Sequence, residues 1–328
     1  MDLEPNGEEQ QVIDATADFL KNAMPLARFR TEGEGRFDAA TRLQLAELGW
    51  FGMGLPEEAG GIGFSAIEET LVFREIGRHL APVAALPLAL AAKLAAEAGD
   101  LTLAKEIAEG AHGVALAVTD PNRSEHRLFD WFGADFVLRF DGEEAQLASL
   151  DGVTVEPGIC LDRSVGQGRA NLTGVRPMLA APRALTERSG RLYTAAMLVG
   201  IAEAVTDLIA EYAKIRFTFG KAIGSYQAVR HPIAEMKTRA FAARQQLFLA
   251  AVSCREDTRD ATMQVAGAKF LANDAAMINV DANIQLHGGI ATTDEHDAHF
   301  FMKRANLLAR LFGAKTVADD LNVLAFAA

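Results

Sequence analysis

Apolar residues recur at close to helical spacing along the first part of the chain. They do so from Glu8 to Arg30, where they mark one face of a helix. Alanine-rich stretches over 84–97 and 101–110 continue the helical pattern. We therefore expect a helical N-terminal domain over residues 1–112.

A stretch rich in glycine, from Gly49 to Gly63, interrupts these helices. It follows a helix expected from Asp38, which is a typical N-cap residue, to Leu48. Glycine and proline at this density indicate a shaped loop. Ser65 and Glu68 then form the pattern of a capping box, so the next helix is expected to begin there and to reach about His79.

Short apolar runs separated by Gly, Asp or Pro replace the helical pattern after residue 112. These runs are Val114–Val118, Phe136–Phe140, Ala145–Leu150 and Val153–Val155. Runs of this length between turn residues predict strands. The segment 113–178 is therefore expected to be a small β domain.

Long helical patterns return from about Pro182. They cover Leu185–Phe217, Ser225–Cys254, Asp260–His287 and Asp297–Leu311, with a last one at Val317–Ala328. Helices of this length favour a bundle, which we place at residues 179–328. The sequence thus predicts a mainly α fold with a small central β domain between two helical domains.

Charge and cysteine content exclude several kinds of protein. The 32 basic and 44 acidic residues give a net charge of -12, which argues against a nucleic-acid partner. Cys160 and Cys254 form no metal-binding pattern, so we expect no metal site and a reducing compartment. An acidic start and the lack of an uncharged apolar run of about 18 residues predict a cytoplasmic protein without a membrane span.

Two short motifs carry candidate chemistry. The first begins with Arg216, whose guanidinium can pair with a diphosphate or can cap the end of a helix. The second runs from Gln285 to Gly289 and ends in two glycines. A glycine pair allows a ligand to approach the backbone, but a glycine also commonly ends a helix.

Taken as whole phrases, these motifs resemble the C-terminal domain of the acyl-CoA dehydrogenase family. The matching phrases are R-x-x-F-G-x-x-I-G-x-x-Q from Arg216 to Gln227 and Q-L-H-G-G-I from Gln285 to Ile290. The loop from Gly49 to Gly63 resembles a loop between N-terminal helices of that family. The resemblance implies FAD as cofactor, usually seated on a neighbouring subunit. The residues implied to contact its diphosphate and adenosine half are Arg216, Phe219, Gln227, Gln285, Gly288 and Gly289.

The resemblance also shows where the chain departs from the family. The family desaturates acyl-CoA thioesters, with a glutamate that removes the α-proton and a flavin that accepts the hydride. The two usual positions of that glutamate correspond here to Phe312 and Gly190, and Glu187 lies three residues away from the second. In the middle domain, the family's A-G-S-D and W-I-T patterns are lost around Val118–Ser124 and Trp131–Ala134.

These departures lead to one main hypothesis. The chain resembles the short, non-catalytic subunit of bacterial heterotetrameric acyl-CoA dehydrogenases, which contain two copies of each of two related subunits. The expected partners are a longer paralogue that carries the glutamate, an acyl-CoA substrate, and electron-transfer flavoprotein or another acceptor. The phrase E-H-x-A-H from Glu295, with Lys303 and Arg304, resembles members that act on bulky acyl-CoA thioesters, including steroid side chains.

Two alternatives stay open at this point. The first is a self-sufficient homomeric flavoenzyme that uses Asp294 or Glu295 as its base. The second is a non-enzymatic acyl-CoA-binding or scaffold protein of the same fold.

Overall fold

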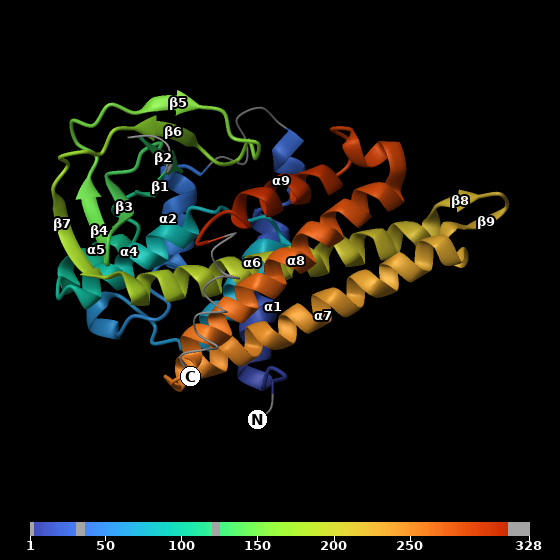
Figure 1. Ribbon diagram of the computed structural model, residues 1–328, viewed down its shortest axis with the longest axis horizontal. Coiled ribbons are helices and arrows are strands. Elements are labelled where there is room, and N and C mark those ends of the chain that lie inside the picture. Colours follow the sequence, from blue (N-terminus) through green and yellow to red (C-terminus); the bar gives the residue numbers. More distant parts are fainter. Residues whose placement is uncertain (1–2, 31–36, 120–124, 314–328) are drawn as a thin grey trace. The chain divides into compact units, whose positions relative to one another are not determined.

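A computed structural model describes residues 3–30, 37–119 and 125–313 (Figure 1). Contacts group the chain into two compact units. Unit 1 takes in the described residues within 1–30, 66–81 and 191–328, and unit 2 those within 31–65 and 82–190. The division of the sequence into three domains stays a prediction, and the helix predicted at Val317–Ala328 lies outside the described residues.

Unit 1 is helical apart from one small hairpin. Its elements are α1 (Gly7–Ala23), η1 (Leu26–Arg30), α3 (Ala66–Arg78), α6 (Arg183–Ile215) from Arg191 onward, β8 (Phe217–Thr218), β9 (Lys221–Ala222), η3 (Ile223–Ser225), α7 (Gln227–Arg255), α8 (Ala261–His287), η4 (Gly288–Thr292) and α9 (Ala298–Leu308). The single helix predicted from Glu8 to Arg30 is wrong. It is two elements, because Pro25 between them has no N–H to continue the helical ladder.

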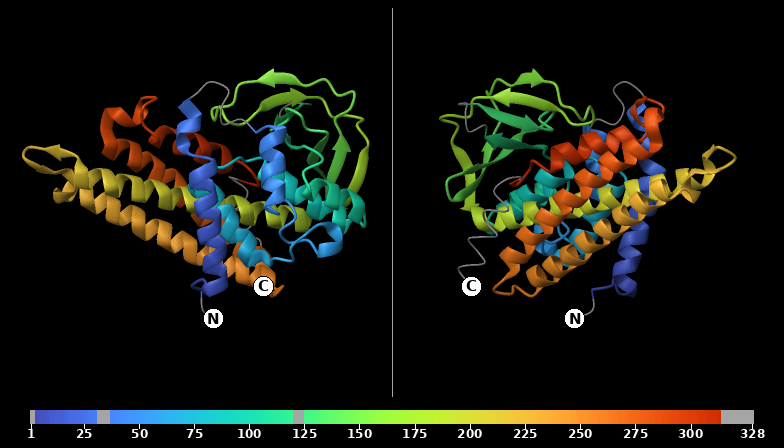
Figure 2. Two further views of the ribbon diagram at one scale, coloured as in Figure 1. Left: turned by 180° about the vertical axis from the view of Figure 1, so that it is seen from behind. Right: turned by 45° about the vertical axis from the view of Figure 1, so that its right-hand side comes forward.

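Three long helices, α6, α7 and α8, lie side by side in unit 1 (Figure 1, Figure 2). Buried Asn279 on α8 ties them together, since its amide donates to Met236 O on α7 at 2.9 Å and to Ala202 O on α6 at 3.3 Å. Helix α3 packs on α6 with almost no side chain between them. A Cβ added at Gly200 would lie 2.0 Å from the carbonyl oxygen of Arg74, so this contact requires glycine.

Helix α6 is long and apolar enough, by length and composition alone, to cross a membrane. Its most apolar 18-residue window has a mean hydropathy of 1.5, and 83% of that window is buried inside the protein. A core helix of a globular protein passes the same test, so this helix is only a weak sign of a membrane span.

Unit 2 combines a sheet with short helices. Its elements are α2 (Ala39–Glu47), η2 (Glu57–Ala59), α4 (Ala85–Glu97), α5 (Leu101–Ala108), β1 (Val114–Thr119), β2 (His126–Phe129), β3 (Phe136–Asp141), β4 (Glu144–Ser149), β5 (Glu156–Gly158), β6 (Gln167–Ala170), β7 (Pro177–Pro182) and the start of α6. The predicted N-cap of α2 is confirmed, because the Asp38 carboxylate accepts from Thr41 N at 2.8 Å.

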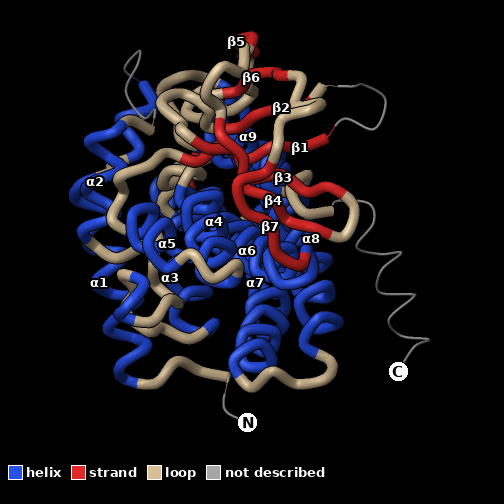
Figure 3. Tube along the Cα trace, turned by 90° about the vertical axis from the view of Figure 1, so that its left-hand side faces the viewer, coloured by secondary structure: helices blue, strands red, loops and turns tan. Residues whose placement is uncertain are grey.

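The seven strands of this sheet follow the order β5-β6-β2-β1-β3-β4-β7 (Figure 3). Strands β1 and β3 are parallel, and every other pair is antiparallel. Small apolar side chains such as Ala115, Val137 and Ala148 form its buried core. The mainly α fold with a central β region is confirmed, whereas the strand predicted at Val153–Val155 is wrong, since β5 begins only at Glu156.

Candidate functional site

The hairpin β8–β9 projects from the ends of α6 and α7 (Figure 1, Figure 2). Its two-residue tip has positive φ at both positions, 50° at Phe219 and 80° at Gly220. Such tips match the twist of the flanking strands, but a phenylalanine with positive φ is uncommon. The Phe219 side chain is 96% exposed. The tip therefore presents an aromatic ring that no described part of the chain covers.

The base of the hairpin is held in place by its own residues. The Tyr226 hydroxyl donates to Thr218 O at 3.0 Å, and the Lys221 ammonium lies 4.2 Å from the centre of the Tyr226 ring. The Ile223 N–H donates to Arg216 O at 2.8 Å. These contacts hold the backbone at the base of the hairpin against the end of α6.

Arg216 lies directly after the last residue of α6. Its N–H donates to Tyr212 O at 2.9 Å, which continues the helical pattern by one residue. Its exposed guanidinium forms no hydrogen bond or ion pair within the described chain. The side chain therefore does not cap the carbonyls of α6, which was the structural alternative to a diphosphate contact.

The second motif forms the end of α8. Gly288 has φ 71° and ψ −155°, a combination that is nearly restricted to glycine, and its N–H donates to the carbonyls of Ile284 and Gln285. Gln285, Gly288 and Gly289 are all exposed. A Cβ added at either glycine would meet nothing within 4 Å. The backbone here is open to a ligand and is not filled by packing.

An aromatic cluster connects the two motifs. The ring of Tyr212, one turn before Arg216, lies 4.5 Å from the ring of His287, and His287 lies 4.4 Å from His296. Burial lowers the pKa of both histidines, so both rings are neutral near pH 7. The end of α6, the end of α8 and the loop before α9 (Ala298–Leu308) therefore meet at one place in unit 1.

Polar atoms at this junction remain without partners. The Nδ1–H of His287 donates to Asn283 O at 2.8 Å, while its Nε2 and both side-chain polar atoms of Asn283 have no hydrogen-bond partner within the described residues. Buried polar groups are normally satisfied, so these atoms keep capacity for further hydrogen bonds.

Gln227 is the first residue of α7 and follows Tyr226 at the base of the hairpin. Tyr226 provides no side-chain cap, so the first N–H groups of α7 have no side-chain partner at the N-cap. The Gln227 side chain is exposed. Arg216, Phe219 and Gln227 thus belong to one continuous segment, and the junction of Tyr212 with His287 connects that segment to the α8 motif.

This set of groups fits a ligand that carries a diphosphate. The Arg216 guanidinium, which has no partner within the described chain, offers donors to phosphate oxygens, and no Cβ covers the backbone at Gly288 and Gly289, so a ligand can approach it closely. The exposed ring of Phe219 offers a flat apolar surface to a heteroaromatic group. FAD contains both kinds of group, so the residues present fit the half of FAD that the sequence implied.

Neither family position for the glutamate holds a carboxylate. Phe312 lies in the turn after α9, half-buried and with φ 55°, and Gly190 is buried inside α6. The neighbouring Glu187 pairs with Arg183 at 2.8 Å, one helical turn away. The two positions that the resemblance assigns to the glutamate are thus occupied by Phe312 and Gly190, and the lack of a catalytic base stays a prediction.

The alternative bases lie in solvent. The Asp294 side chain is 97% exposed, and the His299 ring lies 4.0 Å from its carboxylate. Glu295 is exposed as well, and the backbone carbonyls of both residues accept from Arg30. A base for an α-proton needs a dry pocket, which these carboxylates lack.

Two buried basic side chains have structural roles that the sequence did not predict. Arg304, quoted above with Lys303 as a sign of substrate class, is 1% exposed and donates to Ala81 O at 2.6 Å. Lys269 is fully buried and donates to Leu308 O at the end of α9 and to Asn273 Oδ1. Both residues hold helix and loop ends in place, and single-sequence patterns give no signal for such long-range contacts.

Comparison with known proteins agrees with this reading of the fold. Residues 6–111 match the family model for the acyl-CoA dehydrogenase N-terminal domain, and residues 186–322 match the model for the C-terminal domain. A curated relative, acyl-CoA dehydrogenase IpdE2 of Mycobacterium tuberculosis, is 31% identical over 317 residues, which cover 93% of each chain. The chain belongs to the acyl-CoA dehydrogenase family.

Two solved structures share the fold at lower sequence identity. The steroid acyl-CoA dehydrogenase variant named Tcur3481-Tcur3483 superposes with a TM-score of 0.84, at 24% identity and 98% coverage of both chains. A chain of the ChsE4-ChsE5 complex from Mycobacterium tuberculosis superposes with a TM-score of 0.81, at 21% identity and 98% coverage of both chains. At these identities the likeness concerns the fold.

Proposed function

We propose that this chain is the subunit without a catalytic base in a heteromeric, FAD-dependent acyl-CoA dehydrogenase. One observation carries the proposal. The residues predicted to contact FAD, from Arg216 to Gly289, are exposed to solvent, whereas Phe312 and Gly190 occupy the two positions where the family has its glutamate. We expect this combination, cofactor contacts without a catalytic base, in a chain that binds the cofactor of a partner and catalyses no reaction itself.

In this proposal the chain binds and orients the cofactor of its partner. Arg216 pairs with the diphosphate, and Phe219 and Gln227 line the adenosine side. Gln285 and the open backbone at Gly288 contact the same half of the cofactor. The bound flavin would supply the hydride acceptor for the acyl-CoA, and the partner's glutamate would be the base for the α-proton.

Exposed apolar side chains around the hairpin support a second chain at this end. Ile215 is 76% exposed and Phe217 is 63% exposed, next to the fully exposed Phe219. Grouped apolar side chains of this size on a surface are typical of protein–protein contacts. Two proteins of the same fold, Tcur3481-Tcur3483 and ChsE4-ChsE5, are each named as a pair. We take the partner here to be a longer paralogue.

The proposal also includes the class of acyl-CoA substrate and the electron acceptor. The phrase around Glu295 and His296 resembles members that act on bulky thioesters, and one structural neighbour is named a steroid enzyme. We therefore propose a bulky acyl-CoA, such as a steroid side chain. Electron-transfer flavoprotein in a bacterial cytoplasm is the proposed acceptor.

Expression with and without the partner tests this proposal. The chain is purified alone and after co-expression with a longer paralogue encoded beside it, and FAD per chain is measured from the flavin absorbance. We expect little FAD and no acyl-CoA dehydrogenase activity for the chain alone, and flavin with activity for the mixed complex. A fully flavinated and active single chain would contradict the proposal and favour a homomeric enzyme. A colourless, inactive mixed complex would favour a non-enzymatic scaffold.

A further inference from the structure

Two adjoining cavities in unit 1 form what we call the N-terminal groove. One cavity of about 430 Å³ is lined mainly by charged side chains. The other, of about 410 Å³ and called the apolar cavity below, is lined by apolar side chains of α3 and α7 together with the charged Glu4, Glu9, Arg255 and Glu256. Both are lined by Glu4, Pro5 and Phe248. Each volume is within the range of small-molecule sites. The groove uses none of the residues predicted to contact FAD.

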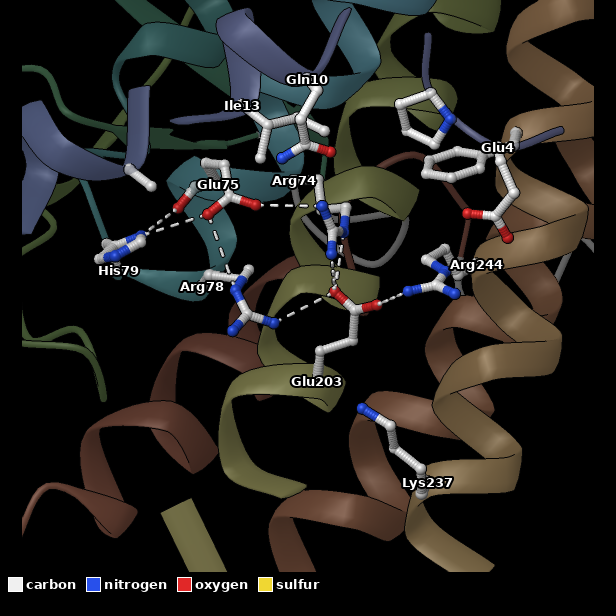
Figure 4. Close-up of a pocket in the computed structure, with 13 residues that line it drawn as sticks. Glu4, Gln10, Ile13, Arg74, Glu75, Arg78, His79, Glu203, Lys237 and Arg244 are labelled. Carbon is white, nitrogen blue, oxygen red and sulfur yellow. Dashed lines mark hydrogen bonds and ion pairs between the residues drawn. The ribbon is translucent and has the colours of Figure 1, made fainter. Parts of the chain in front are cut away.

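The charged cavity lies between α1, α3, α6 and α7 (Figure 4). At its centre Glu203, which is 4% exposed, accepts from three arginines. The shortest distances to them are 2.7 Å for Arg74, 3.3 Å for Arg78 and 3.4 Å for Arg244. Glu75 adds a second buried carboxylate beside Arg74, at 3.1 Å. The two arginines of α3 are therefore well paired.

The cations contributed by α7 are paired less well. Arg244 reaches Glu203 only at 3.4 Å, and its buried Nε has no hydrogen-bond partner among the described residues. Lys237 lies 3.8 Å from Asp207, and its side chain is 64% exposed. Both cations belong to one helix and line one cavity, so they retain capacity to bind a further anionic group.

The apolar cavity continues along the same helices. Ile67 and Leu71 of α3 face Phe248 and Val252 of α7 across it. Leu71 is 1% exposed and Phe248 is 7% exposed, so the inner wall is part of the core surface. Along α7 the apolar cavity follows the charged cavity, so together they match a ligand with an anionic head and an apolar tail.

The N-terminal segment lies between the two cavities. A capping box between Asn6 and Glu9 fixes the start of α1, with Asn6 N donating to Glu9 Oε2 at 2.7 Å. Leu3 and Pro5 before it are half-buried, and Glu4 is exposed. Glu4 lines the charged cavity together with Arg244, and Figure 4 shows both on the same side of it.

Among the described residues, the charges at the cavity balance only when Glu4 is counted. Four cations line it, namely Arg74, Arg78, Lys237 and Arg244. Four carboxylates face them, namely Glu4, Glu75 and Glu203 of the lining and Asp207, which contacts Arg78 and Lys237. If Glu4 moves away, four positive charges face three negative charges. The cavity then accommodates one negative charge.

We propose that the N-terminal groove binds a monoanionic amphiphile, namely a carboxylate with a long apolar tail. Its carboxylate takes the place of Glu4 on the side of the charged cavity where Arg244 lies, and its tail lies between Ile67, Leu71 and Phe248. The Glu4 side chain thus competes with the ligand for Arg244. This site is separate from the predicted FAD contacts and does not depend on the function proposed above.

Calorimetric titration with dodecanoate, below its micellar concentration, tests the proposal on the chain as it is purified, without flavin. Arg244→Met removes the head-group cation and Ile67→Trp fills the apolar cavity from its half-exposed rim. We expect each to weaken binding about tenfold or more. Glu4→Gln should strengthen binding a few-fold. Arg259→Met is the control, because Arg259 is an exposed cation outside the groove.

Three outcomes would overturn the proposal. One is that neither the natural chain nor Glu4→Gln binds dodecanoate. Another is that Arg244→Met and Ile67→Trp bind it as well as Arg259→Met does. The third is that dodecan-1-ol, which lacks the charge, binds as tightly as dodecanoate. Circular dichroism checks that each variant is folded, and Glu4→Gln, an exposed change, gives an answer even if Arg244→Met is unstable.

Discussion

Replacing Glu203 by glutamine should strongly destabilise unit 1. The change removes the charge that three arginines share, while Gln keeps almost the same volume. Breaking a buried ion pair from one side costs about 3 to 5 kcal/mol, because it leaves a buried charge without compensation. Glu75 remains beside Arg74 and Arg78, so we take the lower end, about 3 kcal/mol.

Urea denaturation of the natural chain and of Glu203→Gln measures this cost. A loss of about 3 kcal/mol lowers the midpoint by roughly 1 M. The control is Glu211→Gln, because Glu211 pairs with Lys214 on the same helix but is 70% exposed, and we expect less than about 1 kcal/mol from it. Adding Arg244→Met to Glu203→Gln should recover about 1 kcal/mol, since one unpaired cation is removed. A midpoint for Glu203→Gln equal to that of Glu211→Gln would refute the reasoning.

Two further predictions concern packing and pH. Gly200→Ala should lower the free energy of unfolding by about 3 kcal/mol, because the new Cβ would lie 2.0 Å from Arg74 O. The control is Gly267→Ala, whose Cβ would meet only the end of the Gln246 side chain at 3.3 Å. In the same urea assay it should change the free energy of unfolding by less than about 1 kcal/mol. Burial, with the charge of Arg191, lowers the pKa of Lys269 from 10.5 to about 7. Between these two pH values the unfolded state binds more protons than the folded state, so the natural chain should gain stability relative to Lys269→Met as the pH rises from 7 to about 9.5. If the two chains differ in free energy of unfolding by the same amount at both pH values, the pKa of Lys269 is not lowered.

The long helices of the C-terminal half could be predicted closely from the sequence. The helix predicted at Asp260–His287 begins one residue later, at Ala261, and ends where expected. The reason is physical: an apolar pattern sustained over many turns averages out single misleading residues. Glycine at the ends of such patterns also marks where a helix stops, as Gly288 does here.

The strands were harder to predict because several are polar or end in proline. Strand β6 reads Gln-Gly-Arg-Ala and β7 begins and ends with proline, so neither shows an apolar alternation. Strand β7 forms one edge of the sheet, where missing N–H donors are tolerated. Pairing with neighbours far away in sequence, and not local preference, makes these segments strands.

The site shows the same division between local and long-range information. The positions of Arg216 and Gly288 in their motifs were visible in the sequence, and so was the lack of a carboxylate at residue 312. The junction of Tyr212 with His287, which connects the motifs, joins residues 75 positions apart and leaves no local signal. The buried role of Arg304 was missed for the same reason, because its partner Ala81 is 223 residues away.

The FAD affinity of the mixed complex, with Arg216→Ala on this chain only, tests the central claim most directly. Loss of a charge-assisted contact to a diphosphate costs about 2 kcal/mol, so we expect the dissociation constant of FAD to rise roughly thirtyfold. The matched control is Lys214→Ala, which removes an exposed charge two residues earlier and should leave the affinity unchanged. Equal FAD affinity for Arg216→Ala and Lys214→Ala would contradict the account, because this chain would then hold no part of its partner's cofactor through Arg216.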